Sequence, residues 1–415
     1  MTSFCDMNKF FVILGGNMLL KGVYDKLKSF GYNVIVIDWN DNPAVKGELH
    51  LQIDVKDEKK CIEALKGLGY PVDGCISCID LAVPTVNAIN RWCDNKVMPE
   101  KFNTVLTKEE MRNCWIRDGI FNRVSRRSDD ISLKEILDIN QRQKLIVKPN
   151  VAASSRGITI LEVGQSLSMI EEAIAKAKDK SFDGYALVEE FVEGRESTID
   201  MLGDDYGNVS VYAISVKYHT VNAINNRVAT KLHWNSAVYS DNLYRRIADM
   251  AKRAYRSIGL KNSFGHLEMI TKPDGTFSPV EIGARSSGFI CSHLVSWASE
   301  RDYLGDYLKM LKGEAIENKD HINSGTSAMW YGYDIPKNTD SVCESNLAKF
   351  LPEGITVGYS KRDGLIVPHH YGDMIDDNSR DGYGYEMIYG PKSVLTIDNI
   401  LASEKRFLDE FLGRE

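Results

Sequence analysis

The first hundred residues alternate between apolar runs and helically spaced segments, and this alternation restricts the fold more than any other feature. Three continuous apolar runs, each typical of a strand buried on both faces, occupy 10–14, 33–37 and 74–79. The segments between them predict helices over 21–30, before a glycine stop at Gly31, and over 57–67. A β-α-β-α-β order folds as a parallel sheet with right-handed crossovers, so an α/β fold is expected here.

The middle of the chain mixes short strands with helices. Thr107 and Glu110 have capping-box spacing at the start of a helix that runs through Ile116. Further helices are predicted over 167–178 and over about 243–258, where Gly259 follows. The predicted strands are 144–148, 158–161, 185–190, 197–202, 209–216, 264–271 and 277–282. From about Asn323 the pattern is short and β-leaning, with a final helix near 400–412.

A predicted hairpin around the turn Pro273-Asp274-Gly275 is the most informative segment. Because Pro273 has no N–H, a four-residue loop over 273–276 is favoured, in which opposed residue numbers sum to 549. That register places three opposed pairs on one face, namely Glu268 with Glu281, His266 with Gly283, and Phe264 with Arg285.

Two carboxylates held directly across a ladder repel each other, because their Cβ atoms lie only about 5 Å apart. Either a shared proton or a bridging divalent cation would stabilise Glu268 beside Glu281. Ligation by oxygen alone suits Mg²⁺, with phosphates and waters completing its shell. The alternative is a solvated sheet face on which Arg285 screens the charge. A β-bulge would shift the register by one residue and remove this argument.

Two other segments suggest a nucleotide only weakly when each is taken alone. Lys148 is followed by a loop of small residues whose backbone N–H groups could approach phosphate, although a polar surface loop is the simpler interpretation. The segment ALVEEFVEGRES, at 186–197, is either a charged connector or a hinge between two lobes. In the hinge interpretation, main-chain groups near Glu190 and Val192 would pair with adenine, and Glu196 would bind a ribose.

Taken together, the order and spacing of these motifs resemble the ATP-grasp carboxylate–amine ligases over about residues 10–290. The matching segments read FFVILGG…VIVIDWN, TKEEMR, IVKPNVAASSRGI, LVEEFVEGRES and HLEMI…FSPVEIGARSSG. The resemblance implies an α/β protein with an α+β grasp region. Its expected parts are a Rossmann-like pre-grasp domain at 1–104, a central grasp lobe at 105–192, a C-terminal grasp lobe with the metal site at 193–320, and a β-rich region at 321–415.

The resemblance also implies roles for individual residues, with ATP and Mg²⁺ (alternatively Mn²⁺) as cofactors. Glu268 and Glu281 would bind the metal, and Arg285 and Lys148 would act in catalysis. Many members carry Asn two residues after the second metal carboxylate, where this chain has Gly283, which puts a third protein ligand in doubt. The residues expected to bind the nucleotide are Lys108, Lys148, Ser154, Ser155, Arg156, Gly157, Glu189, Glu190, Val192 and Glu196.

The implied reaction activates a small carboxylate, expected to be an amino acid, as an acyl phosphate and joins it to an amine with release of ADP and phosphate. The L-amino acid ligases are similar in having one grasp unit and an extended C-terminal region. A bicarbonate-using carboxylase or carbamoyl-phosphate-type enzyme is the alternative within the superfamily. It is disfavoured because ARSSGFICSHLVSW stands where biotin carboxylases bind bicarbonate. A non-catalytic nucleotide sensor is the alternative of another class, and the presence of Glu268, Glu281 and Arg285 argues against it.

Several other motifs are better explained by structure. Gly15 and Gly16 with Asp38 resemble a dinucleotide fingerprint, but G-x-G-x-x-G is absent. Cys75-x-x-Cys78 has no second ligand pair for zinc. A structural role is the simpler interpretation for a final set of residues, although substrate or phosphate contacts stay open: His266, His369, His370, Lys217, Arg227, Lys231 and His233.

Charge and composition limit the partners. The balance of 51 basic and 58 acidic residues gives a net charge of −7, without the broad positive field of a nucleic-acid or anionic-membrane binder. No apolar run approaches the length of a membrane span, and eight scattered cysteines are too few for a disulfide scaffold. A cytoplasmic protein is therefore expected, and the resemblance implies a small carboxylate and an amine as its substrates. The resemblance adds a homodimer, for which the sequence shows no interface.

Overall fold

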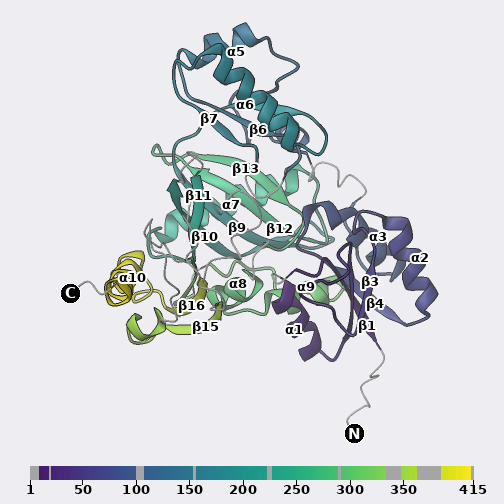
Figure 1. Ribbon diagram of the computed structural model, residues 1–415. Helices are drawn as coiled ribbons and strands as arrows, with labels where there is room; N and C mark the ends of the chain where they lie inside the picture. Colours follow the sequence, from purple (N-terminus) through teal and green to yellow (C-terminus); the bar gives the residue numbers. More distant parts are fainter. Residues whose placement is uncertain are drawn as a thin grey trace.

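Three sheets organise the part of the protein that the structure describes. A computed structural model describes residues 9–17, 20–99, 107–152, 156–221, 227–287, 291–322, 324–332, 347–361 and 385–412. Figure 1 shows a parallel sheet near the N-terminus, a large sheet in the middle, and a small sheet with its helices that projects beyond the large one. The expected α/β class, with α+β character in the middle of the chain, is confirmed.

The first sheet is parallel and has the strand order β3-β2-β1-β4. Its strands are β1 (Phe10–Leu14), β2 (Asn33–Asp38), β3 (Leu49–Gln52) and β4 (Val72–Ile76). Its helices are α1 (Lys21–Ser29), α2 (Glu58–Leu68) and α3 (Val83–Trp92), the last preceded by the short helix η2 (Asp80–Ala82). The β3 strand was not predicted, because this half-exposed edge strand lacks the continuous apolar run of its neighbours.

The small sheet is antiparallel, in the order β5-β8-β6-β7. Its strands are β5 (Ser125–Arg127), β6 (Leu145–Pro149), β7 (Thr159–Leu161) and β8 (Ala186–Glu190). The helices α5 (Leu133–Asn140) and α6 (Leu167–Lys180) pack against it, and α4 (Lys108–Arg117) precedes it in the chain. Its apolar core draws only on residues between Ile131 and Val188.

The large sheet is also antiparallel, in the order β13-β12-β9-β10-β11-β14-β16-β15. The early strands are β9 (Arg195–Gly203), β10 (Val209–Val221), β11 (Arg227–Trp234), β12 (Ser263–Thr271) and β13 (Phe277–Gly283). The late strands are β14 (Thr326–Gly332), β15 (Thr356–Lys361) and β16 (Tyr385–Pro391), and the helices are α7 (Asp241–Ser257), α8 (Cys291–Ser299), α9 (Tyr303–Leu311) and α10 (Ile397–Leu412). The end of the chain thus forms strands, as its β-leaning pattern predicted, and these strands extend the large sheet, which the sequence had not indicated.

One apolar core joins the first sheet to the large one. Phe11 and Ile13 of β1 belong to the same buried cluster as Tyr303 and Tyr307 of α9 and Phe264 of β12. The rings of Phe264 and Tyr307 stack with their centroids 4.0 Å apart. The large sheet therefore has two covered faces, since α7 packs in a second cluster with other residues of β9, β10 and β12.

The hairpin of β12 and β13 has the predicted pairing of Glu268 with Glu281, but it reaches that pairing differently. The loop has three residues, because Lys272 and Thr276 already hydrogen-bond through their main chains and Thr271 pairs with Phe277. A register shift between Glu268 and Met269 then compensates for the shorter loop. The expected four-residue loop is therefore wrong. A bulge was expected to remove the pairing of Glu268 with Glu281, but together with the shorter loop the bulge produces this pairing. The ladder ends at Gly283, so Arg285 is not paired with Phe264 as predicted.

Candidate active site

Two carboxylates of the hairpin meet lysines from two other parts of the chain. The Nζ atom of Lys108 lies 2.8 Å from Oε2 of Glu281. The Nζ atom of Lys217, on β10, lies 2.6 Å from Oε1 of Glu268. Partial burial by itself would raise the pKa of Glu281, but Lys108, followed by Lys148 and Arg285, outweighs it and lowers the pKa to about 2. Glu281 is therefore a carboxylate surrounded by cations.

Local structure fixes Lys108 at the first position of α4. The Thr107 side chain caps this helix by accepting the N–H of Glu110. The Thr107 hydroxyl also donates to the Glu110 carboxylate, whereas the predicted capping box would have bound that carboxylate to the backbone N–H. The backbone of Lys108 bonds to the Asn150 carbonyl, two residues after Lys148. These contacts tie the two lysines to neighbouring points of the backbone.

Lys148 belongs to a buried charge cluster. Its Nζ atom lies 2.6 Å from Oε2 of Glu189, and Arg112 donates to the same carboxylate from Nε at 2.9 Å. Ser125 donates a third hydrogen bond at 2.8 Å. Glu189 was expected to bind the nucleotide, but its side chain is only 1% exposed and lies inside the protein. Because Arg112 follows Lys108 by four residues, one face of α4 supplies cations to both Glu189 and Glu281.

The cluster shifts the ionisation of its members in opposite directions. Burial lowers the pKa of Lys148 to about 7, because the Glu189 charge does not fully offset lost hydration and the repulsion from Arg112. Burial would raise the pKa of Glu189, but Arg112 and Lys148 hold it well below its usual range. Lys148 therefore titrates near neutral pH while its partner stays charged.

Glu196 and Glu268 share one lysine. Lys217 Nζ lies 2.5 Å from Oε1 of Glu196, and His219 Nε2 lies 3.1 Å from the other oxygen of that carboxylate. Burial would lower the pKa of Lys217, but the two carboxylates raise it above its usual value. The residue expected at the ribose and the residue expected at the metal are thus linked through one buried ammonium. The sequence analysis left open a structural role or a substrate or phosphate contact for Lys217, and the structure places this lysine beside Glu196 and Glu268.

Arg285 reaches the site from the turn after β13 and meets the first sheet there. Its Nη2 atom lies 2.6 Å from Oδ2 of Asp80, which follows β4. Burial would lower the pKa of Arg285, but Asp80 raises it above its usual value. The positive charge of Arg285 also contributes, after Lys108 and Lys148, to the lowered pKa of Glu281. Sequence reasoning did not single out Asp80. Its position just after a buried parallel strand was the available signal.

The structure describes only some of the remaining residues that were expected to bind the nucleotide. Ser154 and Ser155 lie outside the described residues. Gly157 has a φ of +71°, and a Cβ atom there would come within 2.8 Å of Lys180. The main-chain N–H of Glu190 donates to Val124, and the Glu190 carbonyl accepts from Arg123. Arg156 and Val192 border these segments, and their contact with a nucleotide stays a prediction.

The donor set fits a metal ion that takes few protein ligands. Among the described residues, no group of three or more His, Cys, Asp or Glu side chains could hold a metal. Two opposed carboxylates alone suit Mg²⁺ that takes its remaining oxygens from phosphates and water. His266 lies across from Gly283 but turns its Nδ1 atom to Asp200 at 3.0 Å, which Trp234 also binds. It has a structural partner, consistent with the simpler interpretation of the sequence.

The apparent dinucleotide fingerprint and the cysteine pair both have structural explanations. Asp38 accepts the N–H of Gly16 at 2.5 Å, so the acid of the apparent dinucleotide fingerprint holds the glycine turn together. Cys75 and Cys78 are buried free thiols. Burial raises the pKa of Cys78 to about 11.

The remaining histidines and basic residues of the sequence analysis are buried, pair with other residues, or lie outside the described residues. His233 is fully buried, and burial lowers its pKa to about 3. Lys231 lies 3.6 Å from Glu404 of α10. The side chain of Arg227, and both His369 and His370, lie outside the described residues.

Within the described ranges, no helix has both the length and the apolarity to cross a bilayer.

Comparisons with known proteins bear on the family and the fold. Residues 141–293 match the family model of the ATP-grasp domain. A D-alanine–D-alanine ligase of Actinobacillus pleuropneumoniae is 25% identical over 279 residues, which cover 63% of this chain and 79% of that enzyme. An L-amino acid ligase from Bacillus licheniformis has a similar fold, with a TM-score of 0.71, 19% identity, and coverage of 97% of this chain and 98% of that one.

A second solved structure extends the similarity of fold to carboxylases. The biotin carboxylase domain of Hydrogenobacter thermophilus 2-oxoglutarate carboxylase, complexed with MgADP, ADP and bicarbonate, has a TM-score of 0.67 and 15% identity. The similarity covers 94% of this chain and 87% of that one. The fold is therefore shared with enzymes of different reactions, and the site must distinguish between them.

Proposed function

Because this chain belongs to the ATP-grasp superfamily, we propose that it is an ADP-forming ligase that activates the carboxyl group of an amino acid and joins it to an amine. One observation carries the proposal. Glu268 and Glu281 are opposed across one ladder, and cations from α4, β10 and the turn after β13 converge on them. Such an arrangement suits the transfer of a phosphoryl group between two anions.

The nucleotide would lie between the small sheet and the hairpin. Lys108 and Lys148 would bind its phosphates in place of their present carboxylate partners. Arg156 and Gly157, with Ser154 and Ser155, would cover the phosphates, while Glu190 and Val192 would border adenine and Glu196 the ribose. Glu268 and Glu281 would hold Mg²⁺, or alternatively Mn²⁺, which when bound neutralises phosphate charge.

The reaction then needs only groups that this site offers. A carboxylate oxygen of the substrate attacks the γ-phosphorus, the bond from that phosphorus to the β–γ bridging oxygen breaks, and ADP leaves. The amine nitrogen next attacks the carbonyl carbon of the acyl phosphate, phosphate leaves, and the proton lost from the nitrogen passes to the released phosphate or to water as the C–N bond forms. Arg285 would bind the carboxyl group and then the oxyanion, and loss of one such donor typically costs about 3–4 kcal/mol.

Release of ADP tests the proposal. Purified protein with ATP and Mg²⁺ receives pooled amino acids, single amino acids, amines or bicarbonate, and product is identified by mass. We expect ADP release that needs both an amino acid and an amine. Glu281→Gln should lose about 100-fold or more in rate. Glu135→Gln, in the exposed capping box of α5, should behave like the wild type. Release driven by bicarbonate would instead identify a carboxylase, and ATP binding without turnover would identify a sensor.

A further inference from the structure

Asp80 lies at the place in the first sheet where a ligand site is expected. In the order β3-β2-β1-β4, the chain runs from β1 to β2 and β3 on one side of β1, and then crosses to β4 on the other side. The point at which the strand order reverses therefore lies between β1 and β4. Ligands of open parallel sheets bind beside the carboxyl ends of the strands at such a point. Asp80 follows the carboxyl end of β4, and it contacts Arg285, which follows β13 of the large sheet.

We propose that Asp80 is a positioning residue for the ligation: it holds the Arg285 guanidinium at the switch point and orients it toward the substrate's carboxyl group. The inference rests on the proposed function, because it assigns Arg285 to that carboxyl group. Asp80 acts through Arg285 and need not touch the reacting atoms.

The donors of Arg285 support this role. A guanidinium has five N–H donors in one plane. Nη2 donates to Asp80 at 2.6 Å and Nη1 donates to the Ser286 carbonyl at 3.1 Å, so two anchors define the orientation of that plane. Among the described residues, the buried Nε atom has no hydrogen-bond partner. An unpaired buried donor is costly, and a carboxylate that approaches this edge would satisfy it.

Gly283 makes room for the ion pair. A Cβ atom at this position would lie 2.8 Å from Oδ1 of Asp80 and 3.4 Å from Cζ of Arg285. Any larger residue would therefore push the carboxylate or the guanidinium aside. The departure from the Asn that the family resemblance suggested thus has a physical counterpart, since the Asp80 carboxylate occupies the space beside the backbone of residue 283.

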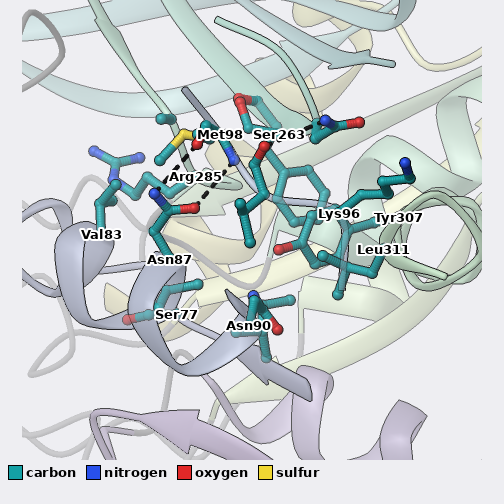
Figure 2. A pocket seen from close by; sticks show the side chains of 16 residues that line it. Ser77, Val83, Asn87, Asn90, Lys96, Met98, Ser263, Arg285, Tyr307 and Leu311 are labelled. Carbon is teal, nitrogen blue, oxygen red and sulfur yellow. Dashed lines mark hydrogen bonds between the residues drawn. The ribbon is translucent and has the colours of Figure 1, made fainter. Parts of the chain in front are cut away.

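Arg285 also lines a small pocket together with Val83 and Met98. Figure 2 shows the Arg285 side chain beside Val83, at the start of α3, and near Met98. The pocket that these residues line has a volume of about 20 Å³, which is enough for little more than one water molecule. Little free space therefore adjoins Arg285 beside Val83 and Met98.

The first experiment separates positioning from a general ion-pair effect. Asp80→Asn is compared with Asp73→Asn, which breaks another contact of β4, the 3.0 Å pair of Asp73 with Lys312. For Asp80→Asn, kcat/KM for the amino acid should fall by about 100-fold, the effect of a misplacement of about 1 Å. The dissociation constant of ATP should stay the same, Asp80→Glu should recover part of the loss, and Asp73→Asn should retain wild-type kcat/KM. Unchanged kcat/KM in Asp80→Asn, or equal losses in both variants, would overturn the proposal.

A second pair of variants perturbs the same contact from the other side. Gly283→Ala should reproduce the kinetic defect of Asp80→Asn, whereas Gly325→Ala, where an added Cβ meets nothing within 4 Å, should not. The double variant Asp80→Asn with Gly283→Ala should be no worse than the more damaged single variant, because both remove one contact. Additive losses would show two separate effects and contradict the assignment.

A third measurement does not depend on turnover. Arginine-specific dicarbonyl reagents modify the neutral guanidine, so the Asp80 contact should protect Arg285. Peptide mass spectrometry should show faster modification of Arg285 in Asp80→Asn than in the wild type or in Asp73→Asn, with Arg301 as the reference within the same chain. Equal rates at Arg285 would refute the positioning contact. If the wild type releases no ADP from any amino acid, the proposed function fails while this result still decides the contact.

Discussion

At the scale of single residues, the site depends on charges that the protein buries and pairs. Glu189 shows this most clearly, because one carboxylate with almost no exposed surface binds Arg112, Lys148 and Ser125. The family resemblance suggested a nucleotide contact for Glu189, yet in this structure its carboxylate is buried and paired with Arg112 and Lys148. The distinction cannot be made from sequence, since it depends on Arg112, which lies 77 residues away in the chain.

Removal of Arg112 should destabilise the fold. Arg112→Met leaves the buried Glu189 carboxylate with fewer cations, and breaking a buried pair from one side typically costs about 3 kcal/mol or more. The free energy of unfolding, measured in urea, should fall by about that amount. Arg117→Met is the control, because its partner Asp118 is exposed and the change should be far smaller. Equal stability of the two variants would contradict the buried network.

The binding of ATP should depend on pH through Lys148. In the free protein its pKa is about 7, and phosphates should raise it because they favour the charged ammonium. Between these two values binding takes up a proton, so affinity should fall as pH rises above about 7, by up to about tenfold per pH unit.

Calorimetry without an amino acid, in buffers of different ionisation enthalpy, measures both the affinity and the proton uptake. The variant Lys148→Arg is the control, since its guanidinium stays charged across this range and the pH dependence should disappear. A wild-type affinity that stays flat from about pH 7 to pH 9 would show that Lys148 does not titrate there.

At the scale of elements, helix starts and strand irregularities place the charged groups. The cap of α4 fixes Lys108 in the first turn, and the bulge in the β12–β13 ladder turns Glu281 to the same face as Glu268. The opposed carboxylates were predicted with a longer loop and no bulge, and the two differences cancel. Glycine geometry explains the shorter loop, because Gly275, at a φ of +78°, closes a three-residue turn readily.

Loss of the α4 cap should weaken both the fold and the nucleotide site. Thr107→Ala removes the acceptor for the Glu110 N–H and should cost about 1 kcal/mol in the free energy of unfolding. It should also weaken ATP binding several-fold, because Lys108 lies in the turn that frays.

The matched control is Ser166→Ala, which removes the equivalent cap of α6. It should cost similar stability without a change in ATP affinity, since no expected site residue lies in the first turn of α6. If both variants weakened ATP binding equally, the effect would reflect general stability and not the placement of Lys108.

At the scale of the whole molecule, the cores decide which parts fold together. The first sheet shares an apolar core with the large sheet, whereas the small sheet has a core made only from its own segment. Figure 1 shows the same arrangement, with the small sheet and its helices projecting from the rest. The domain limits at 104, 192 and 320 stay predictions, and so do a homodimer and a cytoplasmic location.

Hydrogen exchange should reveal this division. Amides of β6 and β8 should open together and at lower free energy than those of β1 and β12, which should open together. Ile136→Ala in α5 should cost about 2–5 kcal/mol and speed exchange in β6 and β8 only. Tyr307→Ala, in the shared core, should instead speed exchange in both β1 and β12. Faster exchange throughout the chain in Ile136→Ala would contradict a separate small-sheet unit.

The sequence by itself determined the features that arise from neighbouring residues. Apolar runs, capping residues and turn glycines act over a few positions, so most strands and helices and the opposed pair Glu268–Glu281 were predictable from them. The family was predictable from the order and spacing of its motifs. Tertiary structure alone decided which charges meet. Asp80 and Arg285 are separated by 205 residues, and Arg112 and Glu189 by 77. Such contacts depend on how the sheets pack, and the packing free energy is spread over many apolar side chains that no local pattern encodes.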